Sequence, residues 1–259
     1  MPRVTVDGAT VRYETGGTPA EEAVVFLPEA GIGPWLWGWQ TPALTGPHRT
    51  LVVALRGTDG SDADPPYTVD RLADDLEAIL RDAAVRRAHL VGAGLGGAVA
   101  LRYARRHNRA RSLVLLGTPQ TGEDVDTEAL RRLCPPSDDR QQFQESLAVG
   151  FSSSFRSAAT DQIRQIRTWR RAEDARGAAR DGLLGSLLEF DAGALYEITL
   201  PTLLLYGLDD PVVPPTVGEA FACDLPNGRF TPVEGRRFHF VEHAAAVTDE
   251  IAEFLTESN

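Results

Sequence analysis

Short, nearly uninterrupted apolar runs alternate along the chain with longer segments whose apolar residues recur at helical spacing. Apolar runs bounded by turn residues are typical of strands covered on both faces of a sheet. Runs of this kind occupy residues 23–27, 50–55, 89–92, 112–116, 201–206 and 229–233. Helix-forming segments occupy residues 68–80, 98–106, 216–223 and 244–255. Near the N-terminus, residues 3–6 and 10–14 alternate around Asp7-Gly8, which predicts a hairpin.

The pattern changes between residues 119 and 196, where no strand-like run occurs. Helical segments are expected there near residues 127–133, 138–149, 159–171 and 175–190. A segment of this length is too long for a plain loop. The alternation on either side predicts an α/β fold with a mostly parallel central sheet and helices on both faces. We therefore expect a core of residues 1–118 and 197–259, and a helical cap of residues 119–196 over the sheet edge where ligands bind.

The net charge of the chain limits the kinds of partner that it is expected to bind. The formal net charge is −11, and all 26 basic residues are arginine. An acidic surface repels phosphate backbones, so we expect no nucleic-acid partner. Two causes could explain the absence of lysine: a GC-rich genome favours arginine codons, and a salt-rich cytoplasm favours acidic protein surfaces. We favour the second, a halophilic source. Thermal midpoints in dilute buffer and in molar KCl would separate the two, because salt screens self-repulsion.

The composition also argues against a membrane protein. No apolar run reaches the length of a membrane span, and the N-terminal residues contain no apolar core of a signal peptide. Cys134 and Cys223 have neither metal-binding nor redox spacing. We therefore expect a cytoplasmic protein without a membrane partner.

Glycines gather between residues 92 and 97, in a strand–turn–helix context. A dinucleotide-binding loop would need this unit to come first, with an acidic residue after the next strand. Here earlier strands precede it, and the next strand ends at Thr118 and Pro119. The spacing fits better the nucleophile elbow G-x-Nu-x-G, which presents one side chain above a sheet. Gly94 then stands in the nucleophile position and offers no side chain for a covalent intermediate.

Four segments together resemble one family over essentially the whole chain. They are VVFLPEAGIGPWLW, LRGTDGSD, HLVGAGLGGAVAL and PTLLLYGLDDPVVPP. Their order resembles the α/β-hydrolase family, and is most similar to small capped esterases, enol-lactonases and haloperoxidase-like proteins. The resemblance implies an α/β-hydrolase fold with a helical cap, and a small-molecule ligand at the cap.

The resemblance also assigns catalytic positions. Asp210 stands where the family keeps its triad carboxylate, although a capping role before the next helix is an alternative. The family histidine aligns with Phe238 or with Arg237, depending on whether the preceding glycine or the following acid is matched. His239 lies one or two residues away and is the candidate general base, or otherwise a packing or surface histidine.

The oxyanion loop departs from the family pattern as well. The resemblance assigns the two oxyanion amides to Ala30 and Leu95. Glu29 replaces a glycine of the family loop, and its carboxylate points either toward the oxyanion hole or into solvent. Trp37 or Trp35 matches a family tryptophan under the cap and is expected in the core or in the pocket wall. The side chains expected at the pocket are those of Glu29, Trp35, Arg237 and Phe238.

These departures favour a non-hydrolytic homologue that lacks the serine nucleophile and the catalytic histidine, yet keeps a pocket for a small apolar or carbonyl ligand. One alternative is a cofactor-independent hydrolase or lyase that uses Asp210 and His239 with the oxyanion amides. Another is a protein-interaction module that uses the cap. We expect no metal and no cofactor, and a Schiff-base lysine is excluded because lysine is absent. The ligand and the oligomeric state are left open.

Overall fold

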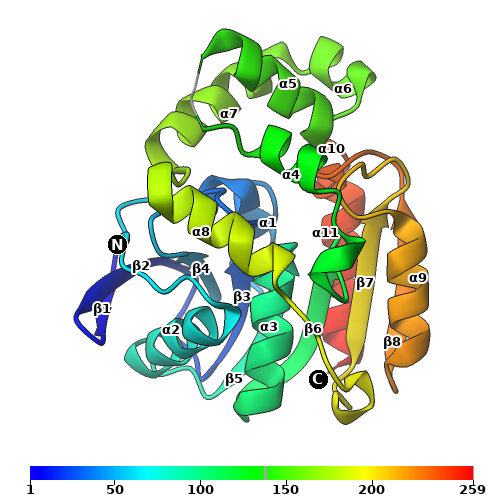
Figure 1. The fold of residues 1–259 in the computed structure, drawn as a ribbon. Coiled ribbons are helices and arrows are strands. Elements are labelled where there is room, and N and C mark those ends of the chain that lie inside the picture. Colours follow the sequence, from blue (N-terminus) through cyan, green and yellow to red (C-terminus); the bar gives the residue numbers. More distant parts are fainter. Residues whose placement is uncertain (137–138, 259) are drawn as a thin grey trace.

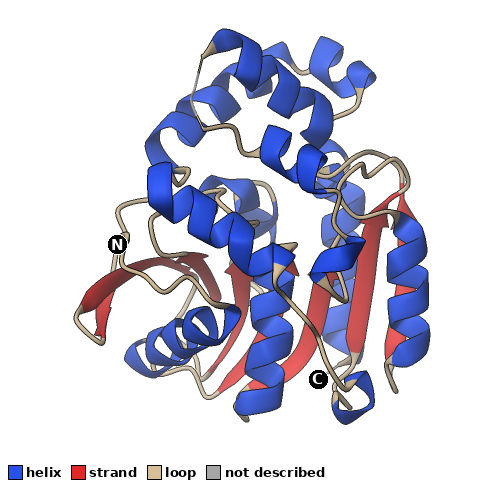
Figure 2. Cartoon of the chain, in the orientation of Figure 1, coloured by secondary structure: helices blue, strands red, loops and turns tan. Residues whose placement is uncertain are grey.

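A single eight-stranded sheet forms the centre of the computed structural model, which describes residues 1–136 and 139–258 (Figures 1 and 2). The strands lie in the order β1-β2-β4-β3-β5-β6-β7-β8. Their bounds are β1 Arg3–Val6, β2 Ala9–Gly16, β3 Glu22–Leu27, β4 Thr50–Ala54, β5 Arg87–Ala93, β6 Ala110–Leu116, β7 Thr202–Gly207 and β8 Gly228–Val233. The pairs β1–β2 and β2–β4 are antiparallel, and the remaining pairs are parallel. The predicted hairpin and the mostly parallel sheet are confirmed.

Helices cover both faces of this sheet. Helices α2 (Val69–Asp82) and α3 (Leu95–Arg106) pack side by side in front of it, and α11 (Ala244–Glu257) lies behind, in contact with α1 (Gln40–Leu44) (Figure 1). Helix α9 (Pro215–Asp224) packs against β7 and β8. Thr68 caps α2 by accepting a hydrogen bond from the amide of Arg71, as expected of an N-cap threonine.

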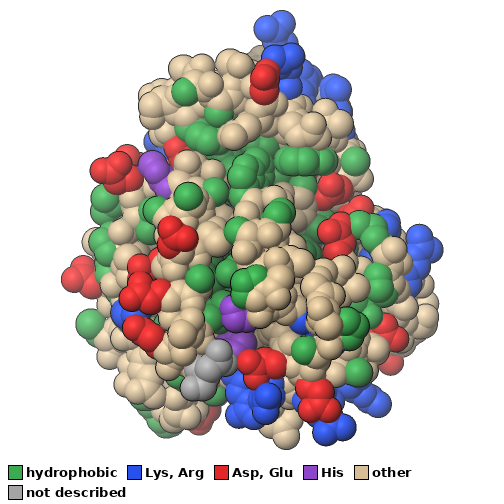
Figure 3. All heavy atoms as spheres, turned by 180° about the vertical axis from the view of Figure 1, so that it is seen from behind, with side chains coloured by type: hydrophobic (Ala, Val, Ile, Leu, Met, Phe, Trp, Pro, Cys, Tyr) green, Lys and Arg blue, Asp and Glu red, His purple; other side chains and the backbone are tan. Residues whose placement is uncertain are grey.

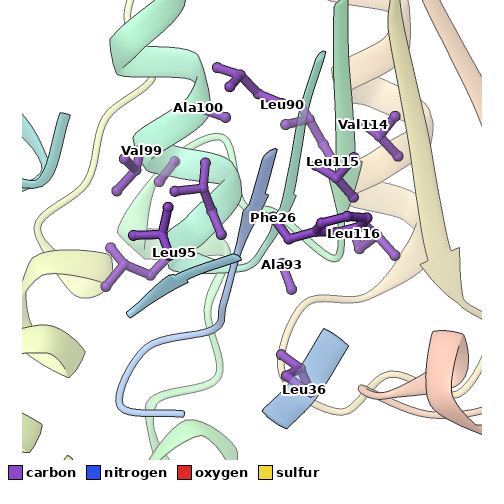
Figure 4. Packing of buried hydrophobic residues seen from close by; sticks show 14 of the residues in the cluster. Phe26, Leu36, Leu90, Ala93, Leu95, Val99, Ala100, Val114, Leu115 and Leu116 are labelled. Carbon is purple, nitrogen blue, oxygen red and sulfur yellow. The ribbon is translucent and has the colours of Figure 1, made fainter. Parts of the chain in front are cut away.

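The core between β3, β5, β6 and α3 fixes the sharp turn at the end of β5. Figure 4 shows Leu90 of β5, Leu115 of β6 and Leu95 of α3 among the side chains packed there. A Cβ atom on Gly92 would lie within 3.0 Å of the backbone of Gly96 and Gly97. The helix can therefore follow the strand this closely only because residue 92 is glycine.

A cap-like helical insertion lies above the carboxyl ends of the parallel strands (Figure 1). Its elements are η2 Gly122–Asp124, α4 Thr127–Leu133, α5 Arg140–Gly150, α6 Ser153–Ala158, α7 Thr160–Glu173, α8 Gly177–Leu188 and η3 Leu195–Glu197. The four predicted helices correspond to α4, α5, α7 and α8. The predicted start of the second, Asp138, lies outside the described residues.

The sequence pattern did not predict several short elements. These are η1 (Pro34–Trp37), α1, α6 and α10 (His239–Glu242). Each spans only four to six residues, too few for a helical period to become visible. In the described part of the chain, no helix is both long enough and apolar enough to cross a membrane.

Candidate functional site

Gly94 occupies the turn between β5 and α3, at the carboxyl edge of the sheet. Its φ is 48° and its ψ is −109°, a conformation that side-chain-bearing residues rarely adopt. A Cβ atom at this position would lie well inside 3.0 Å of both carboxylate oxygens of Glu29, closer than real Cβ atoms come. The absent side chain therefore leaves room for a carboxylate.

The Glu29 side chain points into the site and is fully buried. Its Oε1 accepts hydrogen bonds from the amides of Ala30, at 2.7 Å, and of Leu95, at 3.2 Å. These are the two amides that the sequence assigned to the oxyanion hole. Of the two orientations left open for Glu29, the structure has the one toward these amides. The N-terminus of α3 adds a favourable field for this negative charge.

Arg237 links two carboxylates beneath Gly94. Its Nε lies 2.8 Å from Oε2 of Glu29, and its Nη2 also donates to that oxygen. Its Nη1 donates to Oδ2 of Asp210 at 2.9 Å and to the carbonyl of Gly117 at 2.7 Å. Burial lowers the pKa of Arg237, but the carboxylates of Glu29 and Asp210 outweigh burial and leave the pKa raised. We call Glu29, Arg237 and Asp210 the buried ion network.

Asp210 lies just beyond β7, as expected. Its Oδ1 accepts hydrogen bonds from the amides of Val212, at 2.8 Å, and of Val213, at 3.3 Å. Burial raises the pKa of Asp210, while Arg237 and the two amides oppose that shift. Two carboxylates thus share one guanidinium, and backbone amides compensate the excess negative charge.

His239 is not hydrogen-bonded to Asp210 in this arrangement. It begins α10, where a loop was expected, and its Nδ1 lies 3.2 Å from the carbonyl of Arg236. Burial lowers the pKa of His239 to about 3, so the ring is neutral at ordinary pH. Asp210 instead accepts a hydrogen bond from Arg237. The acid–base alternative needs a hydrogen bond between Asp210 and His239, and the described residues do not form this pair.

Phe238 and Trp35 pack as core residues between the cap and the sheet. They are 1% and 4% exposed, and their ring centroids lie 6.2 Å apart in an edge-to-face contact. Phe238 also contacts Phe151, at 5.5 Å, and Phe240, at 6.0 Å. Trp35 therefore lies in the core, one of the two places expected for it.

The cap holds the loop that carries Glu29. At the end of α7, Oε2 of Glu173 accepts a hydrogen bond from the amide of Trp35 at 2.7 Å. Oδ1 of Asp174 accepts from the amide of Gly33, at 3.0 Å, and from Nε1 of Trp35, at 2.8 Å. The amide of Ala175 donates to the carbonyl of Gly31 at 3.0 Å. The sequence did not predict these hydrogen bonds. Nothing in the local pattern links the carboxylates of Glu173 and Asp174 to a loop some 140 residues earlier.

Hydrophobic side chains gather in the hollow between the cap and the sheet domain (Figure 3). Trp39 of the sheet domain and Trp169 of the cap meet edge to face, with ring centroids 5.8 Å apart. Both are only partly buried, as are Phe155 and Ile163 of the cap. Partly exposed apolar side chains are therefore present where the cap contacts the sheet domain.

Other kinds of centre find no support among residues 1–136 and 139–258. In that part of the chain, no group of three or more His, Cys, Asp or Glu residues is placed to hold a metal ion. Cys134 and Cys223 are both free, and the Sγ of Cys134 donates to the carbonyl of Ala30 at 3.0 Å. Burial raises the pKa of Cys134, which leaves a neutral thiol supporting the loop.

Known proteins resemble the chain along most of its length. The sequence model described as the Alpha/beta hydrolase family matches residues 24–250. A putative carbamate hydrolase RutD from Caulobacter vibrioides (strain NA1000 / CB15N) is 30% identical over 247 residues, 88% of each chain. A 2-hydroxy-6-oxononadienedioate/2-hydroxy-6-oxononatrienedioate hydrolase from Cupriavidus pinatubonensis (strain JMP 134 / LMG 1197) is 28% identical over 264 residues, 90% of this chain and 86% of the relative.

Solved structures agree with this fold. The enol-lactonase from Burkholderia xenovorans LB400 superposes with a TM-score of 0.86 at 22% identity, covering 98% of this chain and 100% of that one. A hydrolase from Pseudomonas aeruginosa PA01 has a TM-score of 0.82 at 29% identity, with 97% and 96% covered. The likeness to the lactonase concerns the fold alone.

Proposed function

The chain belongs to the Alpha/beta hydrolase family, and from this premise we propose that it is a member that does not hydrolyse substrates through a serine triad. One observation carries the proposal. The carboxylate of Glu29 occupies both the oxyanion amides and the space of the nucleophile side chain.

Chemistry explains why this arrangement opposes acyl transfer. Covalent catalysis needs a side-chain nucleophile, which Gly94 does not provide. An oxyanion hole stabilises a negative oxygen as it develops, and loss of one donor typically costs about 2.7–4 kcal/mol of transition-state stabilisation. Here a resident negative charge holds both amides and would repel a second one. Arg237 holds the place beside Asp210, and a permanently protonated guanidinium cannot act as a general base.

Turnover of short p-nitrophenyl esters tests this proposal. We expect rates indistinguishable from the buffer and no labelling by a fluorophosphonate probe, with an active esterase of the same fold as the positive control. Rapid turnover with a burst phase, traced to a labelled residue of this chain, would refute it.

The hollow between cap and sheet favours a binding function in place of turnover. The carbonyl ligand considered from the sequence loses its anchor, because Glu29 takes both amides. An apolar ligand keeps its support, since Trp39 of the sheet domain and Trp169 of the cap contact each other with rings that are only partly buried. A large exposed apolar patch for a protein partner is not favoured, because Met1, Tyr196 and Leu208 are the large hydrophobic side chains that are mostly exposed in the described part.

A neutral apolar fluorophore such as 1-aminoanthracene tests the binding function. We expect saturable binding that quenches tryptophan fluorescence and weakens in the Trp169→Ala variant. Tyr196→Ala is the matched control, since it removes an exposed aromatic ring from η3, at the C-terminal end of the insertion, and not from α7, which carries Trp169. Equal affinities of the two variants would remove the hollow as the binding site.

A further inference from the structure

The Glu29 carboxylate has a complete set of hydrogen-bond donors. Oε1 receives the amides of Ala30 and Leu95, and Oε2 receives Nε and Nη2 of Arg237. A guanidinium that offers two donors on one side is well suited to a carboxylate. On the other side, the Leu95 amide at the N-terminus of α3 and the Ala30 amide of the loop after β3 both donate to Oε1. This donor set is what a protein would present to a bound carboxylate ligand.

Contacts other than Glu29 hold the donors in place. The Leu95 amide is fixed by the β5–α3 turn, where the amide of Gly94 donates to the carbonyl of Leu116 at 3.0 Å. Nη1 of Arg237 is anchored by Asp210 and by the carbonyl of Gly117. Truncation of the Glu29 side chain would therefore leave the donors facing an empty space shaped for a carboxylate.

We propose that Ala30, Leu95 and Arg237 form a carboxylate-binding site that Glu29 occupies in cis, and that a small aliphatic monocarboxylate binds there once the Glu29 side chain is truncated. The inference rests on the proposed non-hydrolytic function, because it treats the former oxyanion amides as ligand donors. The ligand must carry a planar, singly charged group, since the group it replaces is the buried Glu29 carboxylate beside Gly94.

Chain length gives a sharp specificity test. Alanine at position 29 keeps the Cβ atom, so acetate completes the missing atoms. Glycine removes the Cβ atom as well, so propionate completes them. Each variant, refolded from urea with the carboxylate present, should show a thermal midpoint that rises with ligand concentration. Acetamide at equal concentration, and sodium chloride at equal ionic strength, should leave the midpoint unchanged.

Three further proteins serve as controls. The wild-type midpoint should not respond to acetate, because Glu29 already fills the site. Benzoate should not raise the midpoint of Glu29→Ala, because its ring is larger than the atoms that the substitution removes. The double variant Glu29→Ala with Arg237→Met should lose the acetate response, because it lacks the guanidinium.

The inference is overturned if neither Glu29→Ala nor Glu29→Gly responds, or if the double variant responds as strongly as Glu29→Ala. It is equally overturned if neither variant refolds even in the presence of its carboxylate. Refolding only when the carboxylate is present supports it. These outcomes are separate from wild-type ester hydrolysis, whose detection would refute the proposed function whatever the variants bind.

Discussion

Replacing Gly94 with alanine tests whether this glycine makes room for the Glu29 carboxylate. The new Cβ atom would lie far inside contact distance of both carboxylate oxygens. The carboxylate would have to leave Arg237, while the backbone at φ 48° would carry a side chain in a sparsely populated conformation. Two penalties therefore arise from one methyl group.

The magnitudes can be separated. A side chain in this sparsely populated backbone conformation costs about 1–3 kcal/mol. Breaking a buried ion pair by displacing one partner costs about 3–5 kcal/mol. Gly94→Ala should therefore lower the free energy of unfolding by about 4–8 kcal/mol. Glu29→Ala alone should cost about 3–5 kcal/mol, because it removes the same ion pair.

The double variant distinguishes a shared penalty from two independent ones. Once Glu29 is truncated, the methyl group at residue 94 no longer displaces a carboxylate. The double variant then loses the ion pair only once, whereas each single variant loses it. Its free energy of unfolding should therefore fall by about 3–5 kcal/mol less than the sum of the two single decreases. Urea unfolding followed by circular dichroism, extrapolated linearly to water, measures all three free energies.

Gly177→Ala is the matched control for backbone strain. Gly177 has φ 53°, close to that of Gly94, and nothing lies within 4 Å of a Cβ atom placed there. We expect a cost of about 1–2 kcal/mol. The reasoning is refuted if Gly94→Ala costs no more than this control, or if the Gly94 and Glu29 substitutions add to within about 0.5 kcal/mol.

Three further predictions concern charge. Arg237→Met leaves the Glu29 and Asp210 carboxylates buried without a cation, so it should lower the free energy of unfolding by about 3–5 kcal/mol at pH 7. Urea unfolding should show this decrease becoming smaller toward acid pH. An equal decrease at pH 5 and pH 8 would contradict the prediction. Burial, with help from nearby carboxylates, raises the pKa of Glu173 from 4.5 to about 7, so its stabilising contribution is complete below pH 4.5 and is lost as pH rises through 7. Glu173→Gln should thus be more stable than wild type at pH 8 but not at pH 5, and equal thermal midpoints at pH 8 would exclude the shift. His239, with its pKa lowered from 6.5 to about 3, favours folding above pH 6.5 and loses that contribution as pH falls; nitrogen chemical shifts should report a neutral ring from pH 8 to pH 5, and a midpoint near 6.5 would disagree.

Local pattern was enough to predict most of the fold. Strands β3 and β4 are almost wholly buried, so after their first residues, Glu22 and Thr50, they are apolar without interruption, and the apolar run marks the strand. The turn at Gly92 was visible because only glycine tolerates the close approach of the α3 backbone. Helix α10 could not be predicted in this way. It is four residues long, and its first residue, His239, was expected in a loop.

The site was predictable only where backbone position decides it. Gly94 follows from the glycine spacing of the β5–α3 turn, and the resemblance to the α/β-hydrolase family assigned Asp210 and the amides of Ala30 and Leu95. The direction of the Glu29 side chain follows from neither, because it depends on Arg237, 208 positions away along the chain. The sequence alone left two equal orientations for the Glu29 carboxylate, toward the oxyanion hole or into solvent. The contact with Arg237, which is distant in sequence, decides between them.

The buried ion network also explains why no single substitution toward a serine triad restores one. Serine at residue 94 alone collides with the Glu29 carboxylate, as alanine does. Histidine in place of Arg237 removes the cation that both carboxylates share, and leaves their charges poorly compensated. Glycine at residue 29 empties the oxyanion amides but supplies neither nucleophile nor base. Each change alone weakens the fold or leaves the chemistry incomplete, so the three positions form one interdependent unit. Under the proposed function, hydrolysis through a serine triad would require all three positions to change together, because the Glu29 carboxylate fills the space beside Gly94 and Arg237 binds both Glu29 and Asp210.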